Sequence, residues 1–181
     1  NSPYFAKLDD LLHDEEVILH ASTQDLPCLR EVGIHPTKLF DTELAGRLIG
    51  LPRVGLGALV ESLLDIGLAK EHSAQDWSIR PLPEDWLNYA ALDVDVLPAL
   101  MDAVGAALKA QGKSRFATEE FEHLLGFEPK PQKADRWRAM TGLHEVKDQR
   151  KLHVAQLIWK AREQLAQKLD VSPGRLIPDS S

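Results

Sequence analysis

The stretch PEDWLNYAALDVDVLPAL, residues 83–100, holds the residues around which we expect the rest of the chain to fold. It opens with a proline and two acidic residues. These are typical of the first turn of a helix, where a missing N–H costs nothing and carboxylates meet the positive end of the helix dipole. Aromatic and apolar residues then recur three and four positions apart, so they share one face of the helix. Asp93 interrupts this face, and Tyr89 lies one turn before it.

Asp93 has two interpretations. A carboxylate among apolar side chains is costly to bury unless a cation or strong hydrogen-bond donors meet it. Asp93 is therefore either a metal ligand with the Tyr89 phenol beside it, or the ion-pair partner of Arg80 or Lys70, in which case Tyr89 belongs to the core. The Tyr-x-x-x-Asp pattern alone favours the second interpretation.

The residues before this helix favour the metal site. Leu-Ala-Lys at 68–70 and Asp-Trp-Ser-Ile-Arg-Pro-Leu at 76–82 precede Tyr89-x-x-x-Asp93. Together they resemble the third exonuclease motif of the DEDDy 3′–5′ exonucleases, in the form carried by the ribonuclease D family. The resemblance implies that Asp93 binds a catalytic metal ion and that Tyr89 helps to position the attacking water.

A second candidate ligand follows a short apolar run of strand type at 17–21. Ser22 and Asp25 have the spacing of a capping box, which would make Asp25 a structural residue. Asp25 also lies just past the end of a buried strand, where ligands gather in α/β sheets. The sequence His20-Ala21-Ser22-x-x-Asp25 resembles the second exonuclease motif of the same family, so we expect Asp25 to be a metal ligand. His20 is expected to be a packed residue at the strand end.

A second short strand is predicted at 38–40, and residues 56–64 are predicted to form a helix. Asp41 ends the strand and is best interpreted as the N-cap of the next helix. Ribonuclease D relatives carry a similar Phe-Asp-Thr step, and this aspartate is not one of their four catalytic acids. We therefore expect the Asp41 carboxylate to be structural.

The composition limits the possible functions. The 181 residues, 44% of them hydrophobic, can form one medium core with a small second module. No apolar run reaches membrane-spanning length and no signal peptide opens the sequence, so no membrane partner is expected. The single cysteine, Cys28, excludes an internal disulfide and fits a cytoplasmic protein; its thiol is expected to be buried. The net charge of −7 argues against a protein that coats nucleic acid by bulk attraction.

The C-terminal part has a different character. Residues 146–181 contain seven Lys/Arg and four Asp/Glu, a net charge of +3, which suits phosphate contacts. The sequence Trp159-Lys160-x-Arg162-Glu163-x-x-Ala166 lies in a helical pattern and resembles the opening of an HRDC domain, the small helical module that follows the nuclease in ribonuclease D. We expect a partial exonuclease domain at 1–125, a proline-stiffened linker at 126–146 and the start of an HRDC domain at 147–181.

The first motif of the DEDD nucleases, Asp-x-Glu on the opening strand of the sheet, has no convincing match. Asp14-Glu15-Glu16 fits the pattern but precedes the strand that leads to Asp25, instead of lying on an earlier strand. The expected fold is therefore an α/β, ribonuclease H-like DEDD exonuclease core that lacks its first strands. It should be mainly helical, with the start of a helical HRDC domain after it. The chain looks like a fragment, and these residues alone are expected to be inactive.

For the intact protein the resemblance implies a 3′–5′ exoribonuclease that trims RNA 3′ ends, with tRNA precursors as substrates. Two Mg²⁺ or Mn²⁺ ions, ~4 Å apart, would activate water and stabilise the leaving oxygen. Asp25 and Asp93 would bind these ions and Tyr89 would orient the water, while Lys70 and Arg80 would contact phosphate or balance the charge of the site. The alternatives are a DNA-directed DEDDy exonuclease, or a catalytically dead nucleic-acid-binding scaffold of the same fold.

Overall fold

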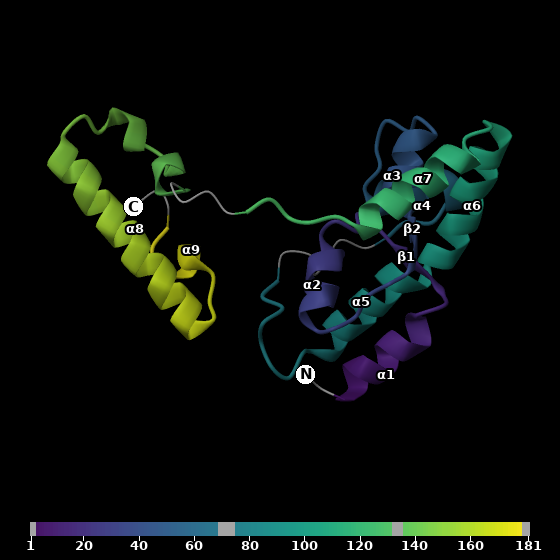
Figure 1. Ribbon diagram of the computed structural model, residues 1–181, viewed down its shortest axis with the longest axis horizontal. Helices are drawn as coiled ribbons and strands as arrows, with labels where there is room; N and C mark the ends of the chain where they lie inside the picture. The colour runs from purple at the N-terminus through teal and green to yellow at the C-terminus, as the bar shows by residue number, and fades with distance from the viewer. Residues whose placement is uncertain (1–2, 69–74, 132–135, 179–181) are drawn as a thin grey trace. The chain divides into compact units, whose positions relative to one another are not determined.

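The computed structural model describes residues 3–68, 75–131 and 136–178. The chain divides into an N-terminal unit, Asn1–Pro129, and a C-terminal unit, Lys130–Ser181 (Figure 1). The boundary lies inside the stretch predicted as a linker, 126–146, so that stretch contributes residues to both units. None of the helices in the described ranges combines the length and the apolar character needed to cross a membrane.

The N-terminal unit contains two short parallel strands, β1 (Glu16–Leu19) and β2 (Lys38–Asp41). They pair in register, from Glu16 opposite Lys38 to Leu19 opposite Asp41. Because the strands are parallel, their carboxyl ends meet at the same edge of the sheet. The residues that follow β1 therefore lie beside the start of the helix that follows β2.

The described residues of this unit form seven α-helices beside the two short strands (Figure 1). The unit is therefore mainly helical, as predicted. They are α1 (Pro3–Leu12), α2 (Asp25–Glu31), α3 (Thr42–Leu48), α4 (Leu56–Leu64), α5 (Glu84–Asp95), α6 (Leu97–Ala110) and α7 (Ser114–Leu125). The helical stretch after residue 83 breaks at Val96, and Pro98 lies in the first turn of α6, where proline is tolerated.

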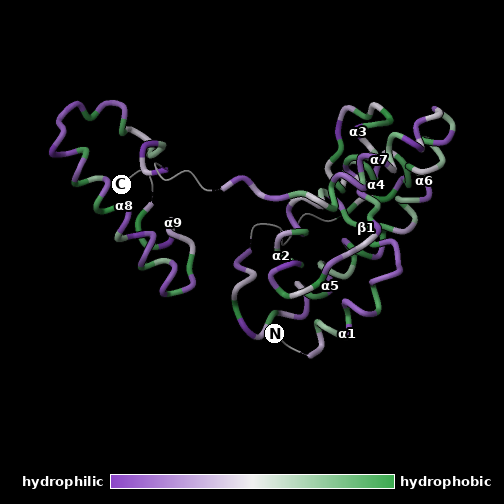
Figure 2. Tube along the Cα trace, in the orientation of Figure 1, coloured by the Kyte–Doolittle hydropathy of each residue, from purple (hydrophilic) through white to green (hydrophobic). Residues whose placement is uncertain are grey.

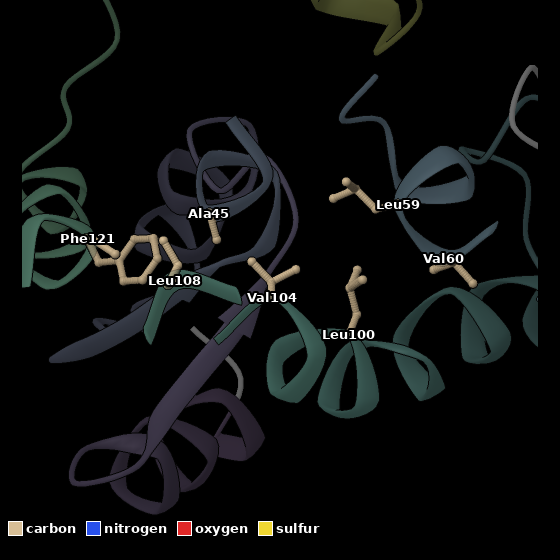
Figure 3. Packing of buried hydrophobic residues seen from close by; sticks show 8 residues of the cluster. Ala45, Leu59, Val60, Leu100, Val104, Leu108 and Phe121 are labelled. Atoms are coloured by element: carbon tan, nitrogen blue, oxygen red, sulfur yellow. The ribbon is translucent and has the colours of Figure 1, made fainter. Parts of the chain in front are cut away.

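The core lies between α6 and the helices on either side of it. Side chains from α6 project towards α3, α4 and α7 (Figure 3). The fully buried members of this cluster are Ala45, Leu59, Val60, Leu100, Val104, Leu108, Ala117 and Phe121. The ring of Phe121 also packs against Phe40 of β2, with centroids 4.8 Å apart. The sheet and α6 are thus fixed by one core, whereas α5 contributes no fully buried residue and extends from α6 towards the site.

The prediction that Cys28 is buried was wrong. Its thiol is exposed, and Sγ lies 3.7 Å from the Gln24 carbonyl. Helix α2 instead buries Leu26, which is 1% exposed. Residues two positions apart on a helix point to opposite sides, so burying Leu26 turns Cys28 towards solvent.

The C-terminal unit is built on the long helix α8 (Gln149–Leu169), followed by α9 (Pro173–Leu176) and preceded by two 3-10 helices, η1 (Arg136–Ala139) and η2 (Leu143–Glu145). Trp137 of η1 and Ala166 of α8 are buried. Apolar and polar residues alternate along the whole of α8 (Figure 2). Much of its apolar surface is exposed, at Val154, Leu157, Ile158, Leu165 and Leu169.

Asp41 joins the two strand ends. As predicted, it caps α3: its Oδ1 accepts from the Leu44 N–H at 3.0 Å. Its Oδ2 also accepts from Ser22, from the N–H at 2.8 Å and from the hydroxyl at 2.6 Å, and Oδ1 accepts from the Ala21 N–H at 3.3 Å. Ala21 has a positive φ of 60°, so these bonds stabilise a turn that an alanine rarely adopts. Both Asp41 and Ser22 are buried.

We expect Asp41→Ala to lower the free energy of unfolding of the N-terminal unit by about 3 kcal/mol or more. Hydrogen bonds to a charged group contribute about 1.5–3 kcal/mol each, and the buried donors that Asp41 accepts from would lose their acceptor. Urea unfolding measures this change. Glu119→Ala, which removes an exposed i,i+4 ion pair with Arg115 on α7, is the control and should cost less than about 1 kcal/mol. Equal effects of the two substitutions would contradict the structural role of Asp41.

Candidate active site

Asp25 is the first residue of α2, immediately after the turn that Asp41 holds. The capping box considered for Ser22 and Asp25 is not formed, because the Ser22 hydroxyl donates to Asp41 instead. The N-cap of α2 is Gln24, which makes no side-chain capping bond. Asp25 is exposed, and no hydrogen bond joins its carboxylate to another described residue. The structural explanation for Asp25 is therefore absent from the described part of the chain.

The electrostatic surroundings of Asp25 favour a cation. Although Asp25 is exposed, neighbouring atoms shield part of its carboxylate from water, which raises its pKa above the ordinary value of 3.8, and the negative charge of Asp41 raises it further. His20 opposes the shift. Because these surroundings disfavour the negative charge of Asp25, a cation that binds to the carboxylate stabilises its ionised form.

Tyr89 and Asp93 lie one turn apart on α5, both half-buried, on the face predicted from the sequence. Burial raises the pKa of Tyr89, and the charge of Asp93 and a side-chain hydrogen bond with Asp93 raise it further. The phenol therefore stays protonated and donates to the carboxylate. This arrangement suits a hydroxyl that orients a neighbouring molecule and does not suit a base.

His20 directly follows β1 and lies beside Thr42, the first residue of α3. Its Nδ1 is 2.9 Å from the Thr42 hydroxyl, which itself donates to the Leu19 carbonyl at 3.2 Å. Because the hydroxyl has one proton, and that proton is directed to Leu19, Nδ1 must donate and Nε2 is left as an acceptor. His20 thus has the packed position at the strand end that the sequence predicted.

The pKa of His20 depends on burial and on several carboxylates around the ring. Burial lowers the pKa of His20 below its ordinary value of 6.5. Carboxylates around the ring oppose that shift, the largest effect first: Asp41, Glu43, Asp25 and Asp93. Asp25 of α2 and Asp93 of α5 thus both act electrostatically on the same imidazole. The sequence did not reveal this role, because no local pattern relates His20 to Asp93.

The loop before α5 is held by Arg80 and by aromatic packing. Nη1 of Arg80 donates to the carbonyls of Trp77 and Ile79, at 2.9 and 2.6 Å. The Trp77 ring packs against Trp86 and Tyr89, with centroid distances of 5.4 and 6.3 Å. Between the described residues there is no ion pair of Arg80 with Asp93, so the alternative interpretation of Asp93 fails for Arg80. Lys70, the other predicted phosphate contact, lies outside the described residues.

The donor set fits a hard cation only in part. Asp25 and Asp93 supply carboxylate oxygens, which Mg²⁺ and Mn²⁺ prefer. In the ranges that the structure describes, however, no group of three or more His, Cys, Asp and Glu residues is arranged to hold a metal ion. Mg²⁺ needs six ligands in octahedral geometry, so a further carboxylate or several water molecules must complete such a site.

Comparison with known proteins assigns the family. Residues 2–109 match the model of a family described as 3′-5′ exonuclease, which is more than half of the chain. The chain belongs to this 3′–5′ exonuclease family. One curated relative is the ribonuclease D of Nitrobacter hamburgensis, 33% identical over 99% of this chain and 47% of the relative. Another is the ribonuclease D of Gluconacetobacter diazotrophicus, 34% identical over 97% of this chain and 46% of the relative. The chain spans about half the length of the curated relatives it matches.

Solved structures agree with this assignment. A protein from Bifidobacterium adolescentis is 45% identical, with a TM-score of 0.91 over 97% of this chain and 43% of its own. Escherichia coli RNase D is 27% identical, with a TM-score of 0.65 over 97% of this chain and 48% of its own. Brucella melitensis NrnC with bound Mg²⁺ is 29% identical, with a TM-score of 0.61 over 66% and 60%. The predicted fold class, a ribonuclease H-like DEDD exonuclease core that is mainly helical here, is confirmed.

We expect Asp25→Asn to raise the Tm of the chain at pH 7. The raised pKa means that the native state favours the protonated form of Asp25 over the ionised form. The stabilisation from this protonated form is complete below pH 3.8 and is lost as the pH rises through the native pKa. The gain in Tm should therefore shrink as the pH falls towards 4, as followed by circular dichroism. Asp10→Asn, at an exposed position of α1, is the control. A lower Tm for Asp25→Asn at pH 7 would mean that the carboxylate has a stabilising partner.

Proposed function

We propose that the whole protein is a metal-dependent 3′–5′ exoribonuclease that hydrolyses the terminal phosphodiester bonds of RNA. The observation that carries the proposal is the match to the 3′–5′ exonuclease family, in a chain that places Asp25 at the start of α2 and the Tyr89–Asp93 pair one turn apart on α5. The chain spans about half the length of its ribonuclease D relatives, so the activity is proposed for the whole protein.

Asp25 and Asp93 would hold Mg²⁺ or Mn²⁺, which supplies charge stabilisation and lowers the pKa of water when bound. The hydroxyl of Tyr89 donates to Asp93, so its oxygen can accept a hydrogen bond from the attacking water and hold that water near the scissile phosphate. His20 remains neutral beside the carboxylates because it is partly buried. It adds no positive charge that would compete with a divalent ion.

Arg80 is the proposed phosphate contact in the described part of the site. Nη1 holds the turn at Trp77 and Ile79, and the side chain is at the surface. A guanidinium can use its remaining donors to bind a phosphate oxygen while Nη1 keeps the turn in place. Lys70 is proposed as a second phosphate contact from the family resemblance alone.

Charge is unevenly divided between the two units. The N-terminal unit contains 10 Lys/Arg and 22 Asp/Glu, a net charge of −12, and the C-terminal unit contains 11 and 6, a net charge of +5. An acidic nuclease unit repels a polyanion unless cations neutralise it. We therefore propose that the C-terminal unit, as the start of an HRDC domain, contributes most of the attraction for the RNA backbone.

RNA is the proposed substrate class. Among the similar solved structures, Escherichia coli RNase D is an exoribonuclease involved in structured RNA processing, and Brucella NrnC has been solved bound to pGG. Trimming of tRNA precursors in the cytoplasm is the specific task that we propose. Equal cleavage of matched RNA and DNA would favour a DNA-directed enzyme instead, since contact with the 2′-OH distinguishes RNA. An absence of cleavage by the whole protein would favour a nucleic-acid-binding scaffold.

In the whole protein, Asp25→Asn and Asp93→Asn should each lower the turnover of a 3′-tailed RNA by about a thousandfold or more, because an amide replaces a charged ligand. Tyr89→Phe should lower it less, by about 10- to 100-fold, because only the positioning of water is lost. Asp95→Asn, exposed on the same helix, is the matched control and should stay within about twofold. A folded Asp93→Asn protein that trims RNA and binds Mn²⁺ normally would end the metal assignment.

RNA binding should weaken as the salt concentration is raised. The double substitution Arg150→Gln with Lys151→Gln on α8 should reduce the magnitude of the slope of log binding constant against log salt concentration by about 1.4. Binding is measured with Asp93→Asn protein in EDTA, so that the RNA is not degraded. Lys7→Gln with Lys109→Gln in the N-terminal unit is the control and should leave the slope unchanged. A larger effect from the control pair would place the RNA on the N-terminal unit.

A further inference from the structure

Arg30 joins α2 to the end of α7. Nη2 donates to the Leu125 carbonyl at 2.6 Å, and Nη1 donates to the Phe127 carbonyl. Nη1 also lies 3.2 Å from Oε1 of Glu128. The Arg30 side chain is 23% exposed and that of Glu128 is 81% exposed, so the two carbonyls are the more protected partners.

The carbonyls that Arg30 contacts need a donor. Leu125 is the last residue of α7, and the last carbonyls of a helix have no partner within the helix and carry its negative partial charge; the Phe127 carbonyl lies just beyond the helix and is a second acceptor. A guanidinium satisfies both requirements, because it is a cation with several donors in a fixed plane. A lysine ammonium in its place would keep the charge but not the planar arrangement of donors.

Helix α2 is held at both ends: after its last turn, Ile34 is buried and its N–H donates to the Leu29 carbonyl at 2.9 Å. The Asp25 and Leu26 N–H groups donate to the Ser22 carbonyl at 3.1 and 2.8 Å, and Leu26 is buried. Ser22 is itself bound to Asp41. Helix α2 has seven residues and no side-chain cap at Gln24. Its start is held through Ser22, and in its last turn the Arg30 side chain ties it to residues 125–128.

We propose that Arg30 is a positioning residue for Asp25, which it controls by fixing α2 to residues 125–128. Asp25 and Arg30 lie at opposite ends of a helix of seven residues, so a shift of the last turn of α2 changes the direction of the Asp25 carboxylate. The proposal rests on the proposed function in one respect, that Asp25 binds a divalent cation.

This arrangement also couples the site to the segment that leaves the N-terminal unit. Residues 126–129 follow α7 directly and end the unit at Pro129 (Figure 1). A force that draws this segment away removes the Phe127 carbonyl and Glu128 from Arg30.

The test is Mn²⁺ binding by the 181-residue chain, followed through the relaxation rate of water protons. Arg30→Ala should weaken binding by about tenfold, the size typical of residues that orient a metal ligand, while Tm and far-ultraviolet circular dichroism stay close to the wild type. Arg30→Lys should recover part of the loss. Arg115→Ala, which removes an exposed arginine of α7, is the matched control and should bind as the wild type does.

Two backgrounds separate positioning from general damage. With Asp25→Asn, adding Arg30→Ala should have no further effect on Mn²⁺ binding, whereas with Asp93→Asn it should keep its effect. Unchanged affinity in Arg30→Ala, or equal losses in both backgrounds, would overturn the proposal. A joint fall of Tm and affinity without recovery in Arg30→Lys would show a structural role only and would also overturn it. Wild-type chain that binds no Mn²⁺ would overturn this inference, whereas the function proposed for the whole protein is tested separately by the turnover of its Asp25→Asn and Asp93→Asn variants.

Discussion

The buried carboxylate of Asp41 is the interaction on which the site depends. It accepts from the turn after β1 and from the start of α3, so one side chain fixes both carboxyl ends of the sheet. The turn contains Ala21 in a left-handed conformation that few residues adopt, and the bonds from Asp41 offset its cost. Ser22 is thereby committed to Asp41, which leaves Asp25 at the surface without a structural task among the described residues.

Local patterns predicted the fold well where one element determines its own surroundings. The strand at 38–40, the helix at 56–64 and the cap at Asp41 all follow from neighbouring residues, and the structure has each of them. The burial of Cys28 could not be predicted in the same way. It depends on which face of α2 meets the rest of the unit, and packing between distant segments decides that.

The sequence predicted which residues belong to the candidate site better than it predicted how they are arranged. Tyr89 and Asp93 share a helix, so their spacing places them together. Asp25 and Asp93 come from distant parts of the chain, and only the family resemblance linked them before the structure showed that both charges act on His20. The contacts of Arg30 with residues 125–128 were beyond reach, because backbone carbonyls leave no trace in a sequence.

The division of charge between the units has a consequence for how the protein behaves in solution. A net charge of −7 describes neither half: one carries −12 and the other +5, on either side of Pro129. Such a chain is amphoteric. At one pH it offers a surface to an anion exchanger and another to a cation exchanger, and its retention on a column reports which unit is accessible. Partners of either sign can therefore compete for it, and raising the salt concentration weakens both kinds of competitor together.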